Sequence, residues 1–122
     1  MGPGPRGEAI ERALGKNLPG NFDVFDKFQN GVATSIKSVN LADKTYSTAQ
    51  GFRNLRKYVD AVEEFQQSTR GGFPLRASEI EQRAMQIAIP RRPVSSVQAK
   101  ALQGLAEYGR LRGVKVYFTE VH

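Results

Sequence analysis

The chain has 122 residues, which suits one domain, and a net charge of +6 from 18 Lys and Arg against 12 Asp and Glu. It has no cysteine, which excludes disulfides, thiolate metal sites and cysteine nucleophiles. Its single histidine is the last residue, His122, which argues against a histidine-rich metal site and a Ser-His-Asp triad. No apolar run approaches the roughly 20 residues that span a bilayer, and the first residues lack the apolar core of a secretion signal.

The basic excess is concentrated in the later part of the chain. Residues 1–30 hold four basic and four acidic side chains, whereas residues 71–122 hold eight and four. A positive field of this kind attracts polyanions such as nucleic acids and speeds their encounter. A basic surface without a specific partner is the alternative that composition leaves open.

The hydrophobic pattern predicts an alternation of helices and strands. A turn signal, Asn30-Gly31, joins the first two strands into a hairpin, and a late strand–helix–strand unit predicts a right-handed crossover. The expected fold class is α/β or α+β, with a mixed central sheet flanked by helices. In chain order we expect a flexible lead-in over 1–6 and one domain over 7–122, containing a helix over 8–15, strands over 22–28 and 32–39, a helix over 51–66, a strand over 83–89, a helix over 96–110 and a strand over 114–121.

The hairpin suggests where chemistry could occur. With Asn30 and Gly31 as the two turn residues, Asp26 lies opposite Ser35, and Lys37 shares their face of the sheet. The other residues expected on that face are mostly apolar, so a carboxylate and an ammonium there need a partner or a ligand. Two interpretations stay open: a cross-strand Asp26–Lys37 ion pair without chemistry, or an active site.

The first predicted helix offers two further acids, Glu8 and Glu11. Glu8 suits a solvated first turn, while Glu11 lies deeper and borders Leu14, so Glu11 is the better candidate ligand. Two carboxylates from separate segments can bind a hard divalent cation through oxygen. Such an ion activates water and polarises a phosphoryl oxygen, and a lysine can stabilise the charge that develops.

Three cations of the first long helix, Arg53, Arg56 and Lys57, lie on its expected exposed side. They are candidates for holding the backbone of a nucleic acid. The alternative is local pairing, with Arg56 bonded to Asp60 one turn on and Lys57 to nearby acids.

The order of these segments resembles the C-terminal nuclease toxin domains of contact-dependent growth inhibition (CdiA-type) exoproteins, from about residue 7 to the end. The resemblance implies a fold similar to the PD-(D/E)XK restriction-endonuclease core. It also implies secretion as the tip of a larger exoprotein, entry into a neighbouring bacterium, cleavage of tRNA or DNA in its cytoplasm, and inhibition by a small immunity protein. The segments that carry it are GEAIERAL, LPGNFDVFD, GVATSIKS, LRKYVDAVEEF, RAMQIAIP and LAEYGRLRGVKVYFTEVH.

Three residues match the site pattern of that family, and a fourth, Ser35, stands where the general pattern has an acid. The acid on the first helix matches Glu11, the Asp of the first central strand matches Asp26, and the acid-x-Lys of the next strand reads Ser35-Ile36-Lys37. The resemblance therefore implies that Glu11 and Asp26 hold a divalent metal (Mg²⁺, Mn²⁺ or Zn²⁺). Lys37 would orient the attacking water or stabilise the phosphorus centre, and Ser35 would bond a metal ligand, a water or the scissile phosphate.

The expected function is a metal-dependent endonuclease toxin. The resemblance favours tRNA over DNA as its substrate. No motif in the chain supports this preference. The alternatives are a DNase of the same fold and a non-catalytic basic module that binds nucleic acid. We also expect an acidic immunity protein, because a tight blocker of a positive cleft should carry complementary potential.

Overall fold

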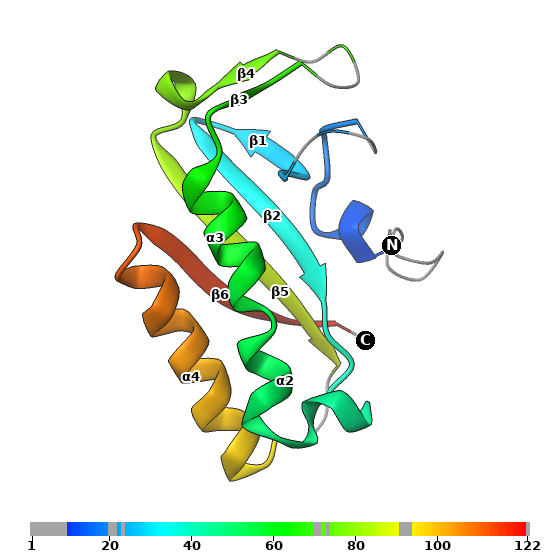
Figure 1. The fold of residues 1–122 in the computed structure, drawn as a ribbon. Coiled ribbons are helices and arrows are strands. Elements are labelled where there is room, and N and C mark those ends of the chain that lie inside the picture. Colours follow the sequence, from blue (N-terminus) through cyan, green and yellow to red (C-terminus); the bar gives the residue numbers. More distant parts are fainter. Residues whose placement is uncertain are drawn as a thin grey trace.

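The structure is a computed structural model that describes residues 10–19, 22, 24–69, 72, 74–90 and 94–121. Its centre is a four-stranded mixed sheet in the order β1-β2-β5-β6 (Figure 1). The first pair is antiparallel and the other two pairs are parallel, which confirms the expected fold class. The strands are β1 (Lys27–Gln29), β2 (Val32–Ser38), β5 (Gln82–Pro90) and β6 (Val114–Val121).

Helices cover one face of this sheet, where α3 packs against β5 and α4 against β6 (Figure 1). A separate two-stranded hairpin, which the sequence analysis did not predict, follows α3. No helix among the described residues combines the length and apolarity that a membrane crossing requires. The remaining elements are η1 (Lys44–Ser47), α2 (Ala49–Arg53), α3 (Arg56–Glu64), β3 (Gln67–Ser68), β4 (Leu75–Arg76), η3 (Ala77–Glu79) and α4 (Ser96–Arg110), with residues 10–13 also helical.

The predicted hairpin turn and its register are confirmed. Asn30 and Gly31 both have positive φ, 52° and 80°, as a two-residue turn of this hand requires. Phe28 pairs with Ala33, the register that this turn predicts.

The strand predicted over residues 22–28 is wrong in its first part, because β1 begins only at Lys27. Val24 has φ 69°, a left-handed conformation that a β-branched residue rarely adopts. The chain therefore bends before Asp26, and Asp26 lies just outside the strand.

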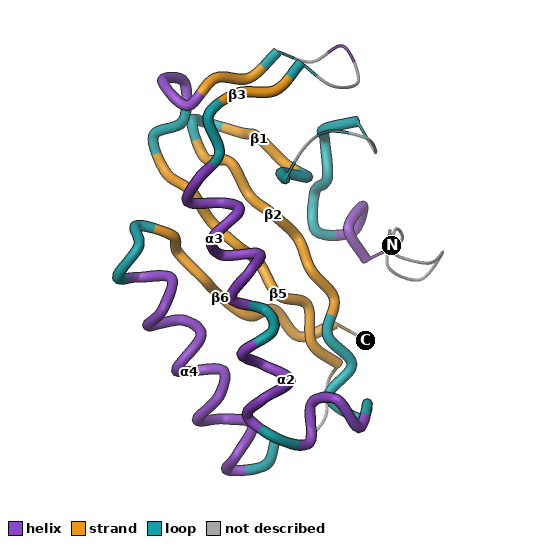
Figure 2. Tube along the Cα trace, viewed as in Figure 1, coloured by secondary structure: helices purple, strands orange, loops and turns teal. Residues whose placement is uncertain are grey.

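The helix predicted over 51–66 is two helices, α2 and α3, with a short break that Figure 2 draws as loop. Across the break the backbone tightens to bonds between residues three apart, with the Leu55 N–H donating to the Phe52 carbonyl and the Tyr58 N–H to that of Leu55. The break is local, because Phe52, Leu55, Val59 and Val62 are all buried at helical spacing in the same core.

The last three elements match their predicted ranges within one residue. Ser95 accepts a hydrogen bond from the Gln98 N–H, and the Gln98 side chain accepts one from the Ser95 N–H, so α4 begins with a reciprocal cap. Near its end α4 lies so close to β6 that a Cβ on Gly109 would be 2.5 Å from Val116 Cγ2. The lead-in over 1–6, Glu8 and His122 lie outside the described residues.

The hydrophobic core fills the space between the sheet and its helices. Large side chains of β5 meet those of α3 and α4 there, and they are almost entirely buried, for example Met85, Ile87, Val59, Val62 and Leu105. This packing makes β2 and β5 a rigid support for the polar residues described below.

Candidate active site

The segment that follows the first helix is tied to β1 by a side chain. Gly15, with φ 96°, ends the helix as predicted. The Asn17 amide donates to the Phe28 carbonyl (2.9 Å) and accepts from the Phe28 N–H (2.8 Å), in the manner of a neighbouring strand residue. The backbone carbonyl of Asp26 accepts the N–H groups of Asn17 and Leu18. The end of the first helix is thus held beside the start of β1.

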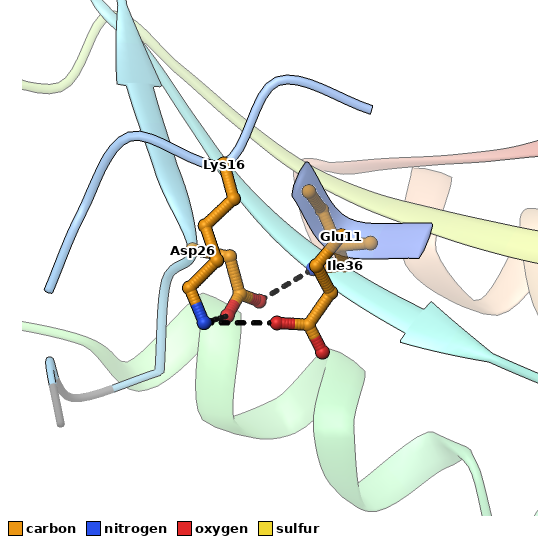
Figure 3. A network of polar contacts seen from close by, with 4 residues as sticks. All are labelled: Glu11, Lys16, Asp26 and Ile36. Atoms are coloured by element: carbon orange, nitrogen blue, oxygen red, sulfur yellow. Dashed lines mark hydrogen bonds and ion pairs between the residues drawn. The ribbon is translucent and has the colours of Figure 1, made fainter. Parts of the chain in front are cut away.

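The carboxylate of Asp26 completes the edge of β2. Asp26 Oδ2 accepts the Ile36 N–H at 2.8 Å (Figure 3). By the hairpin register, a continued ladder would have placed residue 25 opposite that N–H, so the side chain replaces a missing backbone acceptor. Asp26 is held to β2 by this side-chain bond and by its own N–H, which donates to the Thr34 carbonyl at 2.9 Å, and it does not take the place opposite Ser35 expected from the sequence.

Burial raises the pKa of the Asp26 carboxyl above its usual value. The Ile36 hydrogen bond opposes that rise, the negative charge of Glu11 adds to it, and the charges of Lys37 and Lys16 oppose it. The pKa thus reports a carboxylate that lies close to one further anion and two cations.

Glu11 and Asp26 converge on a single positive charge. Lys16 Nζ lies 3.0 Å from Glu11 Oε1 and 3.8 Å from Asp26 Oδ1 (Figure 3). The side chains of Glu11, Lys16 and Asp26 are 6%, 16% and 20% exposed. The structure therefore brings together the two carboxylates predicted as metal ligands, with a lysine that the sequence analysis did not single out.

This donor set fits a divalent cation. One oxygen of each carboxylate already faces a common point that the Lys16 ammonium takes, so the ammonium acts as a stand-in ion. Among the described residues there is no cluster of three or more His, Cys, Asp and Glu that could hold a metal. Hard divalent ions are often bound by one or two carboxylates, with water and substrate phosphate completing the coordination.

Ser35 and Lys37 are two residues apart on β2, so both lie on the face of the sheet that α3 covers. Ser35 is 1% exposed and pairs in register with Met85, and Lys37 pairs with Ile87. Lys37 Nζ lies 4.4 Å from the centre of the Tyr58 ring, a cation–π arrangement. Of the two interpretations left open by the sequence, the cross-strand Asp26–Lys37 ion pair is not formed, and Asp26 pairs with Lys16 instead.

The three cations predicted as a substrate-binding set do not lie together, and the division falls between Arg56 and Lys57, which are neighbours on α3. Lys57 Nζ lies 5.0 Å from the centre of the Tyr58 ring, which Lys37 also contacts. Arg53 and Arg56 instead line an open groove of about 310 Å³ between α2, α3 and α4. The Arg56 guanidinium lies 4.7 Å from the centre of the Tyr108 ring.

Asp60 takes partners other than Arg56. It accepts a hydrogen bond from the Tyr108 hydroxyl at 2.7 Å and lies 3.8 Å from Arg112 Nε. Arg56 and Lys57 are both exposed, so α3 presents cations on two different sides.

Sequence reasoning missed Lys16. Lys16 directly follows the helix-ending Gly15, and a cation at that position, five residues after Glu11, was a usable signal for a pair with Glu11. Its contact with Asp26 joins two segments that meet through tertiary bonds, such as those of Asn17 with Phe28 and with the Asp26 carbonyl, so local patterns do not reveal it.

Two curated proteins are similar to the chain. It is 31% identical over 126 residues to "Deoxyribonuclease CdiA-o11" of Escherichia coli O157:H7 (strain EC869), covering 95% of this chain and 33% of that protein. It is 25% identical over 112 residues to "Deoxyribonuclease CdiA" of Yersinia pseudotuberculosis serotype O:3 (strain YPIII), covering 88% and 10%. The chain therefore spans about a third and a tenth of the length of these relatives.

A solved structure has the same fold. It is the "CdiA-CT/CdiI toxin and immunity complex from Yersinia pseudotuberculosis", with a TM-score of 0.76, 25% sequence identity, and coverage of 98% of this chain and 100% of that one. The family described as "CDI toxin restriction endonuclease-like domain" matches residues 6–119. The resemblance inferred from the sequence is confirmed, and the chain belongs to this family.

Proposed function

We propose that this domain is a metal-dependent endonuclease that cleaves DNA inside bacteria neighbouring the producer. Both curated relatives are named deoxyribonucleases. These names favour the DNase alternative over the tRNA preference drawn from the sequence, and they give that preference no support.

The observation that carries the proposal is the convergence of Glu11 and Asp26 on one cation position next to β2. In the proposed site these two carboxylates hold the divalent ion. The ion, when bound, polarises a phosphoryl oxygen and makes a water more acidic. The Ile36 N–H fixes the Asp26 carboxylate, so its orientation is set before substrate arrives.

Lys37 and Ser35 have complementary proposed roles. The Lys37 ammonium orients the attacking water or stabilises the negative charge that develops on the phosphate, and its Coulombic effect on Asp26 supports its proximity. The Ser35 hydroxyl bonds a water or the scissile phosphate. The rigid β2–β5 pair beneath both residues limits their freedom to move.

The cations of α2 and α3 are the proposed contacts to the DNA backbone. Lys57 shares the Tyr58 ring with Lys37, so it is the one placed to contact phosphates next to the cleavage point. Arg53 and Arg56 would contact more distant phosphates. Such contacts add affinity without sequence preference and weaken steeply with salt.

The proposed biological setting follows from the relatives. The solved relative is a toxin and immunity complex, and we propose a cognate immunity protein for this domain, of acidic character to match its net charge of +6. The curated relatives are much longer than this chain, which supports the proposal that the domain is the tip of a secreted exoprotein and is delivered into target cells.

A cleavage assay tests the proposed function. Plasmid DNA and total tRNA are incubated separately with the domain and Mg²⁺, Mn²⁺ or Zn²⁺, with and without chelator. We expect DNA cleavage that chelator abolishes. Cleavage of tRNA alone would favour the tRNase that the sequence analysis preferred. No cleavage of either substrate with any ion would favour the alternative of a non-catalytic basic module that binds nucleic acid.

Matched variants separate catalysis from binding. Asp26→Ala and Lys37→Ala should lower the cleavage rate by roughly 10³-fold or more while salt-dependent DNA binding persists. Glu120→Ala and Lys115→Ala remove an exposed carboxylate and an exposed ammonium of β6, and both should cleave like the wild type. Equal losses in all four variants would contradict the assigned site.

A further inference from the structure

We propose that Lys16 is a built-in occupant of the cation site, whose ammonium bridges Glu11 and Asp26 until a divalent ion displaces it. The inference rests on the proposed metal site and adds to it a residue and a competition. Its basis is geometric, because the same two carboxylate oxygens lie 3.0 Å and 3.8 Å from Lys16 Nζ.

The two carboxylates need a cation between them. Glu11 and Asp26 are both mostly shielded from water and lie 3.0 Å and 3.8 Å from the same ammonium, so their like charges repel each other. Incomplete hydration strengthens their repulsion, which the single charge of Lys16 reduces but does not cancel. A divalent ion would balance both negative charges, so it has an electrostatic advantage over the ammonium at the same point.

The ammonium and the ion cannot share this point. A second cation within bonding distance of the same oxygens would be repelled strongly at these separations. Binding of the ion therefore requires the Lys16 ammonium to leave, and the free energy of breaking its ion pairs with Glu11 and Asp26 is subtracted from the free energy of ion binding.

The structure allows the ammonium to leave without unfolding. The backbone of Lys16 is fixed on both sides, because its N–H donates to the Glu11 carbonyl and the next residue, Asn17, is bonded to Phe28. The four-carbon stem between that fixed backbone and the ammonium is flexible. Rotation of the side chain is thus sufficient to expose both carboxylates to an ion.

The test compares Lys16→Met, which keeps much of the stem and removes the charge, with Lys115→Met, the same change at an exposed lysine of β6. Mn²⁺ and Zn²⁺ affinities are measured by calorimetry on the whole domain, and melting temperatures are measured in chelator. Lys16→Met should bind the ions roughly tenfold tighter or more, because no ammonium has to be displaced. It should also melt several degrees lower in chelator, while Lys115→Met changes neither quantity.

A double variant separates lost charge balance from lost packing. Glu11→Gln combined with Lys16→Met removes one carboxylate together with the ammonium, so most of the melting temperature in chelator should return. A double variant that melts as low as Lys16→Met would show that the lysine acts through its stem, and would overturn the proposal.

Other outcomes distinguish this proposal from the proposed function. Unchanged or weaker ion binding by Lys16→Met overturns the role of Lys16, even if the wild type cleaves DNA. Tighter ion binding by Lys16→Met with no DNA cleavage by the wild type supports the role of Lys16 and overturns the DNase assignment. A failure of both proteins to bind any divalent ion overturns the displacement and the metal-dependent mechanism together.

Discussion

The two ends of the described chain are built in different ways. The β5–α4–β6 unit is regular: its strands pair in register from Arg83–Val114 to Pro90–Val121, and its helix packs on them through apolar side chains. The segment from the first helix to β1 depends instead on side-chain bonds to the backbone, such as those of Asn17 and Asp26. The regular unit supports the sheet, and the irregular segment supplies the two carboxylates and Lys16 of the candidate site.

The largest expected effect is a loss of stability in the regular β5–α4–β6 unit. In Gly109→Ala the new methyl group would lie 2.5 Å from Val116 Cγ2 and 2.8 Å from the Val114 carbonyl oxygen, so α4 or β6 must shift. We expect the free energy of unfolding to fall by about 2–3 kcal/mol, measured by urea denaturation.

The matched control lies one and a half turns earlier on the same helix. At Gly104 a Cβ would meet nothing within 4 Å, so Gly104→Ala should raise the free energy of unfolding by about 0.5–1 kcal/mol through its helix propensity. Equal stability of the two variants would mean that α4 and β6 are not held as closely as described.

The next effect loosens the irregular segment. Asn17→Ala removes both bonds to Phe28 and should lower the free energy of unfolding by about 1–2 kcal/mol. Cleavage should fall further than this stability loss explains, because only the backbone bonds of residues 17 and 18 to the Asp26 carbonyl then hold Glu11 and Lys16 beside Asp26. Asn40→Ala, which removes an exposed bond to the Ala42 N–H, is the control. Full cleavage by folded Asn17→Ala would show that the Asn17–Phe28 bonds do not position the site.

The smallest effect is a pH dependence at Asp26. Burial raises the pKa of its carboxyl above the usual 3.8, so the folded state resists ionisation and loses stability as pH rises from 3.8 through the raised pKa. The Asp26→Asn variant has no carboxyl to ionise, so it avoids this loss of stability. It should melt higher than the wild type at pH 7, and the gap should close below pH 3.8. Melting temperatures across this range test the sign, and a gap that widens toward acid would contradict it.

Local sequence patterns predicted the regular parts well. The Asn30-Gly31 turn set the hairpin register, and the apolar alternation and serine cap set β5, α4 and β6 within a residue. They failed where tertiary contacts override local preference. The left-handed backbone at Val24 and the tightened turn before α3 have no simple local signature.

The residues of the candidate site likewise divide into those that local sequence patterns predict and those that depend on tertiary contacts. Glu11, Asp26 and Lys37 were accessible from the hairpin and from the family resemblance, since each occupies a fixed place along the chain. Lys16 was missed because its contact with Asp26 depends on how two segments meet. Arg53 and Arg56 line the groove while Lys57 lies near the Tyr58 ring, because successive residues of a helix such as Arg56 and Lys57 point about 100° apart.

The Asn17 amide has a consequence for the molecule's behaviour in a crowded cell. β1 is an edge strand, and exposed strand edges are templates for pairing with other chains. Because Asn17 engages both the N–H and the carbonyl of Phe28, a stray strand finds neither group open at the middle of β1. A single side chain thus protects this border of the sheet against aggregation.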